Sequence, residues 1–88
     1  MKLRGDFVVR QVMDNTVAIP VGQAALQLNG MILLNDVSKI IWEALAQDAD
    51  LETIVTAVTD VFEVSAAEAR TDILDFIEKL RKMQLLDE

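Results

Sequence analysis

The segment MILLNDVSKIIW, residues 31–42, joins a short apolar run to a capped helix with almost no loop between them. The four apolar residues 31–34 follow the turn pair Asn29-Gly30, a pattern typical of a short strand near the edge of a sheet. Asn35 then offers a side-chain oxygen to the free amides of the next helix. The sequence therefore predicts a strand coupled rigidly to a helix, and this joint limits the folds open to the chain.

The residues before this segment favour strands. Two β-prone runs, residues 7–13 and 16–19, predict an antiparallel hairpin whose two-residue loop is Asp14-Asn15. The connection over residues 21–29 has no clear pattern, and we assign no element to it. Together with residues 31–34, the hairpin predicts a three-stranded antiparallel sheet.

The residues after the segment favour helices, because apolar side chains recur there at helical spacing. The first helix covers residues 36–46, and Asp50 caps the second. Ser65 with Glu68 three positions on has the form of a capping box for the third, which runs to about Met83. We therefore expect one α+β domain over residues 1–88, with a sheet followed by three helices as in winged helix-turn-helix proteins.

Composition limits the chemistry open to this chain. Of its 88 residues 52 % are apolar, enough to fill one small core, and there is no Cys and no His. The commonest general base and the usual thiolate and imidazole metal ligands are therefore missing. We expect no catalytic residue, no metal and no cofactor. The N-terminal residues form no signal peptide and no apolar run could span a membrane, so we expect a soluble cytoplasmic protein.

The net charge of −7 is unevenly distributed. Residues 1–47 carry four basic and four acidic side chains, whereas residues 48–88 carry four basic and eleven acidic ones. Such a surface repels nucleic acid and anionic lipid, so we expect neither as a partner. A winged-helix DNA-binding regulator stays as the alternative, because the third helix of such a fold would enter the major groove. The mixed charges of the third helix oppose this alternative.

The third helix separates into faces at about 100° per residue. A core face is predicted from the apolar residues Ala69, Ile73, Phe76, Leu80 and Met83. A second row has apolar residues in its middle and a guanidinium at each end: Arg70, Leu74, Ile77 and Arg81. This row is either a boundary where arginine stems cover the core, or one wall of a groove that contacts an extended, partly acidic ligand.

With these features, the sequence resembles the PqqD-like proteins over nearly its whole length. The resemblance is carried by the hairpin, the strand ending in Leu34-Asn35, the Ile41-Trp42 pair, the capped third helix and the closing KLRKMQLL of residues 79–86. Members of this family act as peptide chaperones or recognition domains for ribosomally made, post-translationally modified peptides. The chain departs from many relatives at Ser38 and Gln84, where they carry glycine.

The resemblance implies a non-catalytic peptide chaperone that presents the leader segment of a precursor peptide to a modifying enzyme, in this family commonly a radical S-adenosylmethionine enzyme. The leader adds as an antiparallel strand beside the third strand, in the cleft between that strand and the third helix. An open edge can also pair with a second copy, so a homodimer is another use of it. The expected peptide-binding residues are Met31, Ile32, Leu33, Leu34, Arg70, Ile73, Leu74, Ile77 and Arg81.

Overall fold

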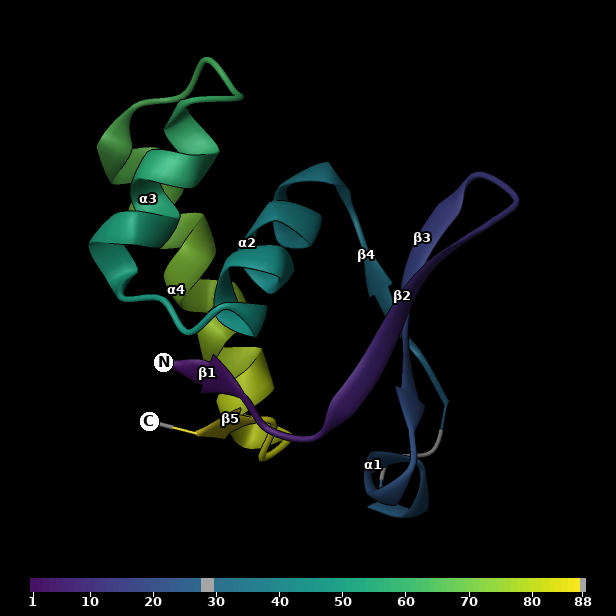
Figure 1. Ribbon diagram of the computed structural model, residues 1–88. Helices are drawn as coiled ribbons and strands as arrows, with labels where there is room; N and C mark the ends of the chain where they lie inside the picture. The colour runs from purple at the N-terminus through teal and green to yellow at the C-terminus, as the bar shows by residue number, and fades with distance from the viewer. Residues whose placement is uncertain (28–29, 88) are drawn as a thin grey trace. The chain divides into compact units, whose positions relative to one another are not determined.

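The computed structural model describes residues 1–27 and 30–87 and divides the chain into two units (Figure 1). The sheet unit is Gly5–Lys39, and the helical unit is Met1–Arg4 together with Ile40–Glu88. The boundary between the units falls inside a helix, α2 (Asp36–Ala46). The expected α+β order is confirmed, since a three-stranded antiparallel sheet precedes the long helices. That the chain acts as one domain stays a prediction.

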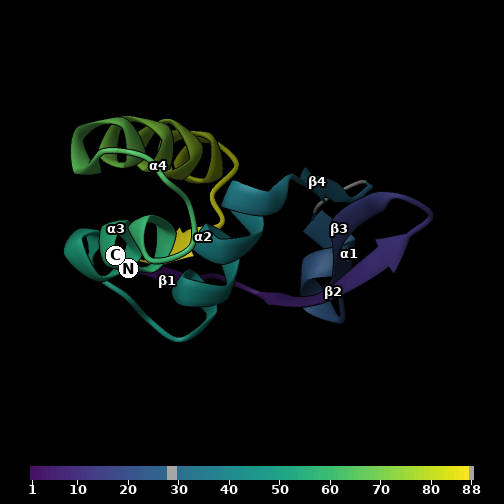
Figure 2. The same cartoon turned by 90° about the horizontal axis from the view of Figure 1, so that it is seen from above.

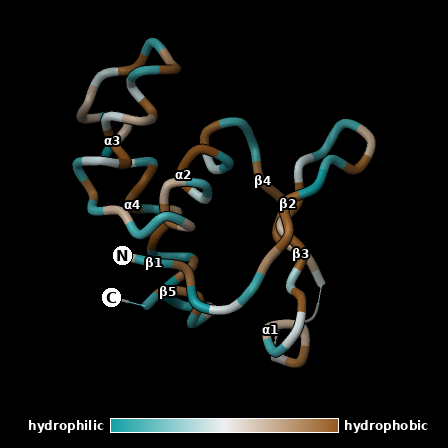
Figure 3. The backbone as a smooth tube through the Cα atoms, in the orientation of Figure 1, coloured by the Kyte–Doolittle hydropathy of each residue, from teal (hydrophilic) through white to brown (hydrophobic). Residues whose placement is uncertain are grey.

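The sheet unit contains β2 (Asp6–Val12), β3 (Asn15–Val21) and β4 (Ile32–Leu34), paired in the order β2-β3-β4. All pairs are antiparallel. The view from above shows β3 between its two neighbours (Figure 2). The tube is hydrophobic where the three strands adjoin (Figure 3), which follows from the Val, Ile and Leu residues that fill them.

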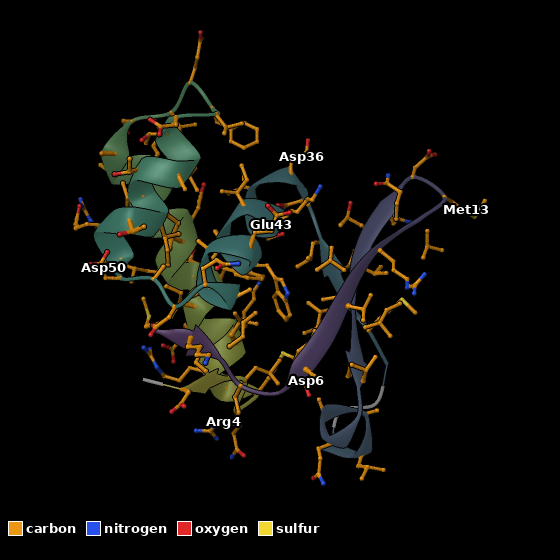
Figure 4. The ribbon with its side chains drawn as sticks, in the orientation of Figure 1. Arg4, Asp6, Met13, Asp36, Glu43 and Asp50 are labelled. Atoms are coloured by element: carbon orange, nitrogen blue, oxygen red, sulfur yellow. The ribbon has the colours of Figure 1, made fainter. Side chains whose placement is uncertain are left out.

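The hairpin loop predicted at Asp14-Asn15 is wrong by one residue. Val12 pairs with Asn15, so the loop is Met13-Asp14, and Met13 has φ +57°. This register places Phe7, Val8 and Val9 opposite Pro20, Ile19 and Ala18 and extends the pairing over seven residues. The three apolar pairs are consecutive in this register, and the positive φ is confined to Met13, which lies exposed at the hairpin tip (Figure 4).

The connection between β3 and β4 contains a short helix, α1 (Gln23–Gln27), to which the sequence assigned no element. It packs against β3 and β2. Its Ala24 is buried and lies so near Gly5 that a Cβ at Gly5 would come within 3.1 Å of the Ala24 Cβ. The predicted turn pair before β4 lies partly outside the described residues, because only Gly30 of that pair, with φ +96°, is described.

In the helical unit, α3 (Leu51–Thr59) packs against α4 (Ala66–Lys82), and both views show the two helices side by side (Figures 1 and 2). Both predicted N-caps are confirmed. Asp50 Oδ1 accepts a hydrogen bond from the Thr53 amide at 2.8 Å, and Ser65 Oγ accepts one from the Glu68 amide at 3.1 Å. These bonds fix where each helix begins, because they satisfy amides that have no partner inside the helix.

The core of the helical unit consists of aliphatic side chains from all three long helices, joined by Trp42. Its buried members are Ile41, Trp42, Leu45, Ala49, Ile54, Val55, Val58, Ala69, Ile73, Ile77, Leu80, Leu85 and Leu86. Among the described residues, every buried side-chain nitrogen or oxygen has a hydrogen-bond partner. No helix in the same residues is both long and apolar enough to span a membrane.

A second, two-stranded sheet joins the ends of the chain and was not predicted. It consists of β1 (Lys2–Leu3) and β5 (Leu86–Asp87), which pair antiparallel. The Arg4 amide extends this pairing by donating to the Leu85 carbonyl at 2.7 Å. Both strands belong to the helical unit, so this pairing fixes the two ends of the unit to each other.

The end of α4 is a Schellman motif with glutamine where glycine is preferred. The Gln84 amide donates to the Arg81 carbonyl at 3.0 Å, and the Leu85 amide donates to the Leu80 carbonyl at 2.9 Å. Gln84 has φ +60°, the left-handed conformation that costs most residues about 1 kcal/mol. Leu80 and Leu85, at the two positions where apolar side chains usually accompany this motif, are both buried, and their burial offsets that cost.

We predict that Gln84→Gly stabilises the protein by about 0.5 to 1 kcal/mol, because glycine adopts the left-handed conformation without a Cβ clash. Thermal unfolding followed by circular dichroism measures the gain. Gln84→Ala is the matched control: it also shortens the side chain but keeps the Cβ, so its midpoint should stay at or below that of the wild type. Equal midpoints for the glycine and alanine variants would contradict this explanation.

The cap of α3 also makes stability depend on pH. Hydrogen bonds from the Thr53 side chain and backbone to Asp50 lower the pKa of that carboxyl below its ordinary value. A lowered pKa in the folded state stabilises the fold above the unfolded pKa, near 3.9, and the contribution is lost as the pH falls through the folded pKa.

We therefore predict that Asp50→Asn, which keeps the capping oxygen but cannot ionise, narrows the stability difference between pH 6 and about pH 3. Urea unfolding of both proteins at the two pH values measures it. If the variant loses as much stability on acidification as the wild type, the Asp50 carboxylate is not a source of the pH dependence.

Candidate functional site

The outer edge of β4 is the first candidate surface. Only β3 pairs with β4 in the described residues, through Thr16 with Leu34, Val17 with Leu33 and Ala18 with Ile32. The prediction that this strand lies at a sheet edge is therefore confirmed, although the strand begins at Ile32 rather than Met31. Its outward backbone N–H and C=O groups are able to pair with another extended chain.

The side chains of β4 alternate between the two faces of the sheet. Leu34 is buried, with 4 % of its surface exposed, while Leu33 on the opposite face is 66 % exposed. Met31, just before the strand, is 57 % exposed. An extended ligand beside β4 would therefore meet apolar side chains on the Leu33 face, and such cross-strand apolar contacts stabilise a sheet.

The joint between β4 and α2 is held by reciprocal hydrogen bonds between two residues. The Ser38 amide donates to Asn35 Oδ1 at 2.8 Å, and the Asn35 amide donates to Ser38 Oγ at 2.7 Å. The predicted cap at Asn35 is confirmed, and Ser38 completes a capping box with a hydroxyl in place of the usual carboxylate or amide. Ser38 is buried, so a larger residue at this position would not keep the same geometry.

The second candidate surface is a row on α4, and here one prediction is wrong. Leu74 is 46 % exposed and Arg70 and Arg81 are partly exposed, as expected, but Ile77 is only 2 % exposed. Ile77 lies about 40° around the helix from the buried Ile73 and so falls inside the core face. We define the α4 row by the three residues that remain accessible: Arg70, Leu74 and Arg81.

The predicted core face of α4 needs a matching correction. Ala69, Ile73 and Leu80 are buried as expected, but Phe76 is half-buried and Met83 is exposed. The buried face is therefore turned toward Ile77. Ile73, which we expected to contact peptide, is fully buried and belongs to the core. Neither Ile73 nor Ile77 offers a surface that a ligand could reach in this conformation.

Both guanidinium groups of the α4 row already have acidic partners. Arg70 Nη2 lies 2.7 Å from Glu52 Oε1 on α3, and Arg81 Nη1 lies 2.6 Å from Glu78 Oε2 one turn earlier on α4. Because the four side chains are between 40 % and 72 % exposed, solvent screens both pairs, and each contributes about 0 to 1 kcal/mol. A ligand carboxylate could replace either glutamate at small cost.

A polar hollow of about 490 Å³ lies within the sheet unit, beside the end of β4. It is lined by Gln11, Asp14, Asn15, Thr16, Leu33, Leu34, Asn35, Asp36 and Lys39. The sequence did not indicate it, because it needs the hairpin tip and the start of α2 to be close. Neither in this hollow nor elsewhere in the described residues do three carboxylate, His or Cys side chains gather in a way that could hold a metal ion.

These features define a small α+β protein chain with an open apolar edge strand joined to a capped helix, and with a long amphipathic helix. The chain belongs to the PqqD family: the family model described as "Coenzyme PQQ synthesis protein D (PqqD)" matches residues 16–86. No curated protein matches the chain significantly.

A solved structure has the same fold. It is described as TbiB1 in complex with the TbiA(beta) leader peptide, is 24 % identical to this chain, and superposes with a TM-score of 0.74 over 99 % of this chain and 95 % of its own. The likeness confirms the α+β fold. The peptide-binding roles of the individual residues stay predictions.

We predict that Asn35→Ala destabilises the protein by about 1 kcal/mol, because the Ser38 amide loses its acceptor at the start of α2. Asn35→Asp keeps an acceptor oxygen and adds a favourable charge at the helix N-terminus, so it should cost little. Urea unfolding of the two variants checks this. Equal losses in both would show that the capping oxygen does not hold the joint.

Proposed function

We propose that this protein is a non-catalytic peptide chaperone that binds the leader segment of a ribosomally synthesised precursor peptide by strand addition to β4. The observation that carries the proposal is the open edge of β4: β3 pairs with one side of this strand, and no strand in the described residues pairs with the other side. Membership of the PqqD family and the fold shared with a leader-peptide complex support it. Main-chain pairing of this kind gives affinity, while side-chain contacts give specificity.

The α4 row supplies the side-chain specificity in this proposal. Leu74 selects an apolar anchor of the peptide, and Arg70 and Arg81 favour acidic residues on either side of that anchor. When a peptide carboxylate replaces Glu52 or Glu78, each guanidinium stays paired. The net gain in binding free energy from each arginine is therefore small. The leader that fits is therefore extended, apolar at its centre and acidic at its flanks.

The partner to which the peptide is presented is a modifying enzyme of the same pathway. In this family such enzymes are commonly radical S-adenosylmethionine enzymes, and we extend that expectation to this chain. The chaperone itself needs no cofactor for this role, because strand addition forms and breaks only hydrogen bonds and apolar contacts. We propose that it acts in the cytoplasm, where precursor peptides are synthesised.

The DNA-binding alternative gains no support from the charges of α4. The helix carries four acidic and four basic side chains and so has no net charge. Two of its basic groups, Arg70 and Arg81, already pair with glutamates. A recognition helix needs an excess of Lys and Arg toward the phosphates, which α4 lacks.

We predict that Leu74→Asp weakens binding of a leader peptide that is apolar at its centre and acidic at its flanks by about 2 kcal/mol, because it places an unpaired charge against an apolar anchor. Arg70→Ala and Arg81→Ala should each cost about 1 kcal/mol or less. Isothermal titration calorimetry measures the three losses. Since Leu74 is half-exposed, the variant should remain folded, which its thermal midpoint checks.

Asp75→Ala is the matched control, since Asp75 is an exposed neighbour of Leu74 on α4 but lies outside the α4 row. It should bind with wild-type affinity. The proposal for α4 is wrong if Leu74→Asp and Asp75→Ala bind the peptide equally well.

A further inference from the structure

The two edges of the three-stranded sheet are protected differently. The outer strand β2 carries exposed Asp6 and Arg10, and charges of this kind prevent an edge from pairing with another chain. The other outer strand, β4, carries none, and the preceding Met31 is also apolar. An edge strand without charged residues is open to pairing along its whole length.

The sheet unit, which carries this open edge, has a smaller net charge than the helical unit. Residues 5–39 contain Asp6, Asp14 and Asp36 against Arg10 and Lys39, a net charge of −1, so the remaining −6 lies outside the sheet unit. Two copies that meet through their sheet units therefore repel each other least. The exposed Leu33 and Met31 give that meeting an apolar contact.

We propose that, without peptide, β4 pairs antiparallel with β4 of a second copy about a two-fold axis at Leu33, which joins two three-stranded sheets into one. A two-fold axis there sets Leu33 against the partner subunit's Leu33 and Ile32 against the partner's Leu34. Directly opposite residues lie on the same sheet face, so the two most exposed side chains of the strands cover each other.

The flanking residues do not oppose this register. On the same axis Met31 meets the partner's Asn35, and Gly30 meets the partner's Asp36, so no two like charges face each other. Pairing over three strand residues exchanges few hydrogen bonds. The dimer is therefore weak and reversible, with a dissociation constant of roughly 10 to 1,000 µM.

This inference rests on the proposed function in one respect: the second copy and the leader peptide use the same edge. The two are then mutually exclusive, and peptide binding is coupled to dissociation of the dimer. Self-pairing would protect an aggregation-prone edge until a precursor peptide replaces it.

Sedimentation of the full chain without peptide, from about 10 µM to about 1 mM, tests the dimer directly. We expect a monomer–dimer equilibrium whose dissociation constant rises at least about ten-fold in Leu33→Lys, because two like charges then face each other on the axis. Val61→Lys is the matched control, since Val61 is 64 % exposed in a loop of the helical unit and the charge change is the same. It should dimerise like the wild type.

Cross-linking gives a second readout that does not depend on the lysine variant. The chain has no cysteine, so Leu33→Cys and Val61→Cys each add a single thiol of similar exposure. Thiols opposite each other on antiparallel strands are close enough to form a disulfide, and Leu33→Cys should cross-link at least about ten-fold faster under mild oxidation. A monomer at every concentration, or equal cross-linking of both variants, overturns the inference. Peptide binding by β4 is then still judged separately, by NMR contacts between a leader peptide and residues 31–34.

Discussion

The hydrogen bonds between Asn35 and Ser38 fix the point at which the chain leaves the sheet and enters α2. In each of the two bonds a backbone amide donates to the short side chain of the other residue, so the joint has little freedom to shift. The strand before it ends at Leu34, and the register with β3 is then set by three pairs. In that register Leu34 is buried and Leu33 is exposed, so Leu33 is the most accessible apolar side chain that the strand offers.

In the proposed function, peptide binding depends on backbone groups more than on side-chain chemistry. A strand edge binds any extended chain, and this tolerance suits a protein whose ligand has no fixed structure of its own. Specificity must then come from a few side chains, and Leu74 is the accessible apolar candidate on α4. The drawback is that such an edge can also pair with other chains, and β4 carries no charged residue that would prevent this.

Local signals carried most of what the sequence predicted. Asn35, Asp50 and Ser65 each cap a helix as expected, because a cap depends only on residues within one turn. The strand of residues 31–34 was also found, since apolar runs between turn signals are local. The hairpin loop was missed by one residue, because the pairing of whole strands, and not the turn residues, decided its register.

Features that depend on distant residues could not be predicted. Nothing near Lys2 indicates that it pairs with Asp87, and two-residue strands have no pattern of their own. Helical periodicity located the core face of α4 only to within about 40°, which was not enough to decide the side on which Ile77 lies. The hollow beside β4 depends on Asp14 and Asp36 coming together through the sheet, and spacing along the chain gives no hint of it.

The central claim is that a leader peptide becomes a fourth strand of the sheet beside β4. The most direct measurement is an NMR experiment on isotopically labelled protein with an unlabelled leader peptide that is apolar at its centre and acidic at its flanks. Strand addition predicts cross-strand contacts between the peptide backbone and residues 31–34, together with slowed amide exchange of outward-facing β4 groups. Peptide-induced shifts confined to the solvent-exposed faces of α3 and α4, with residues 31–34 unchanged, would contradict it even if the peptide binds.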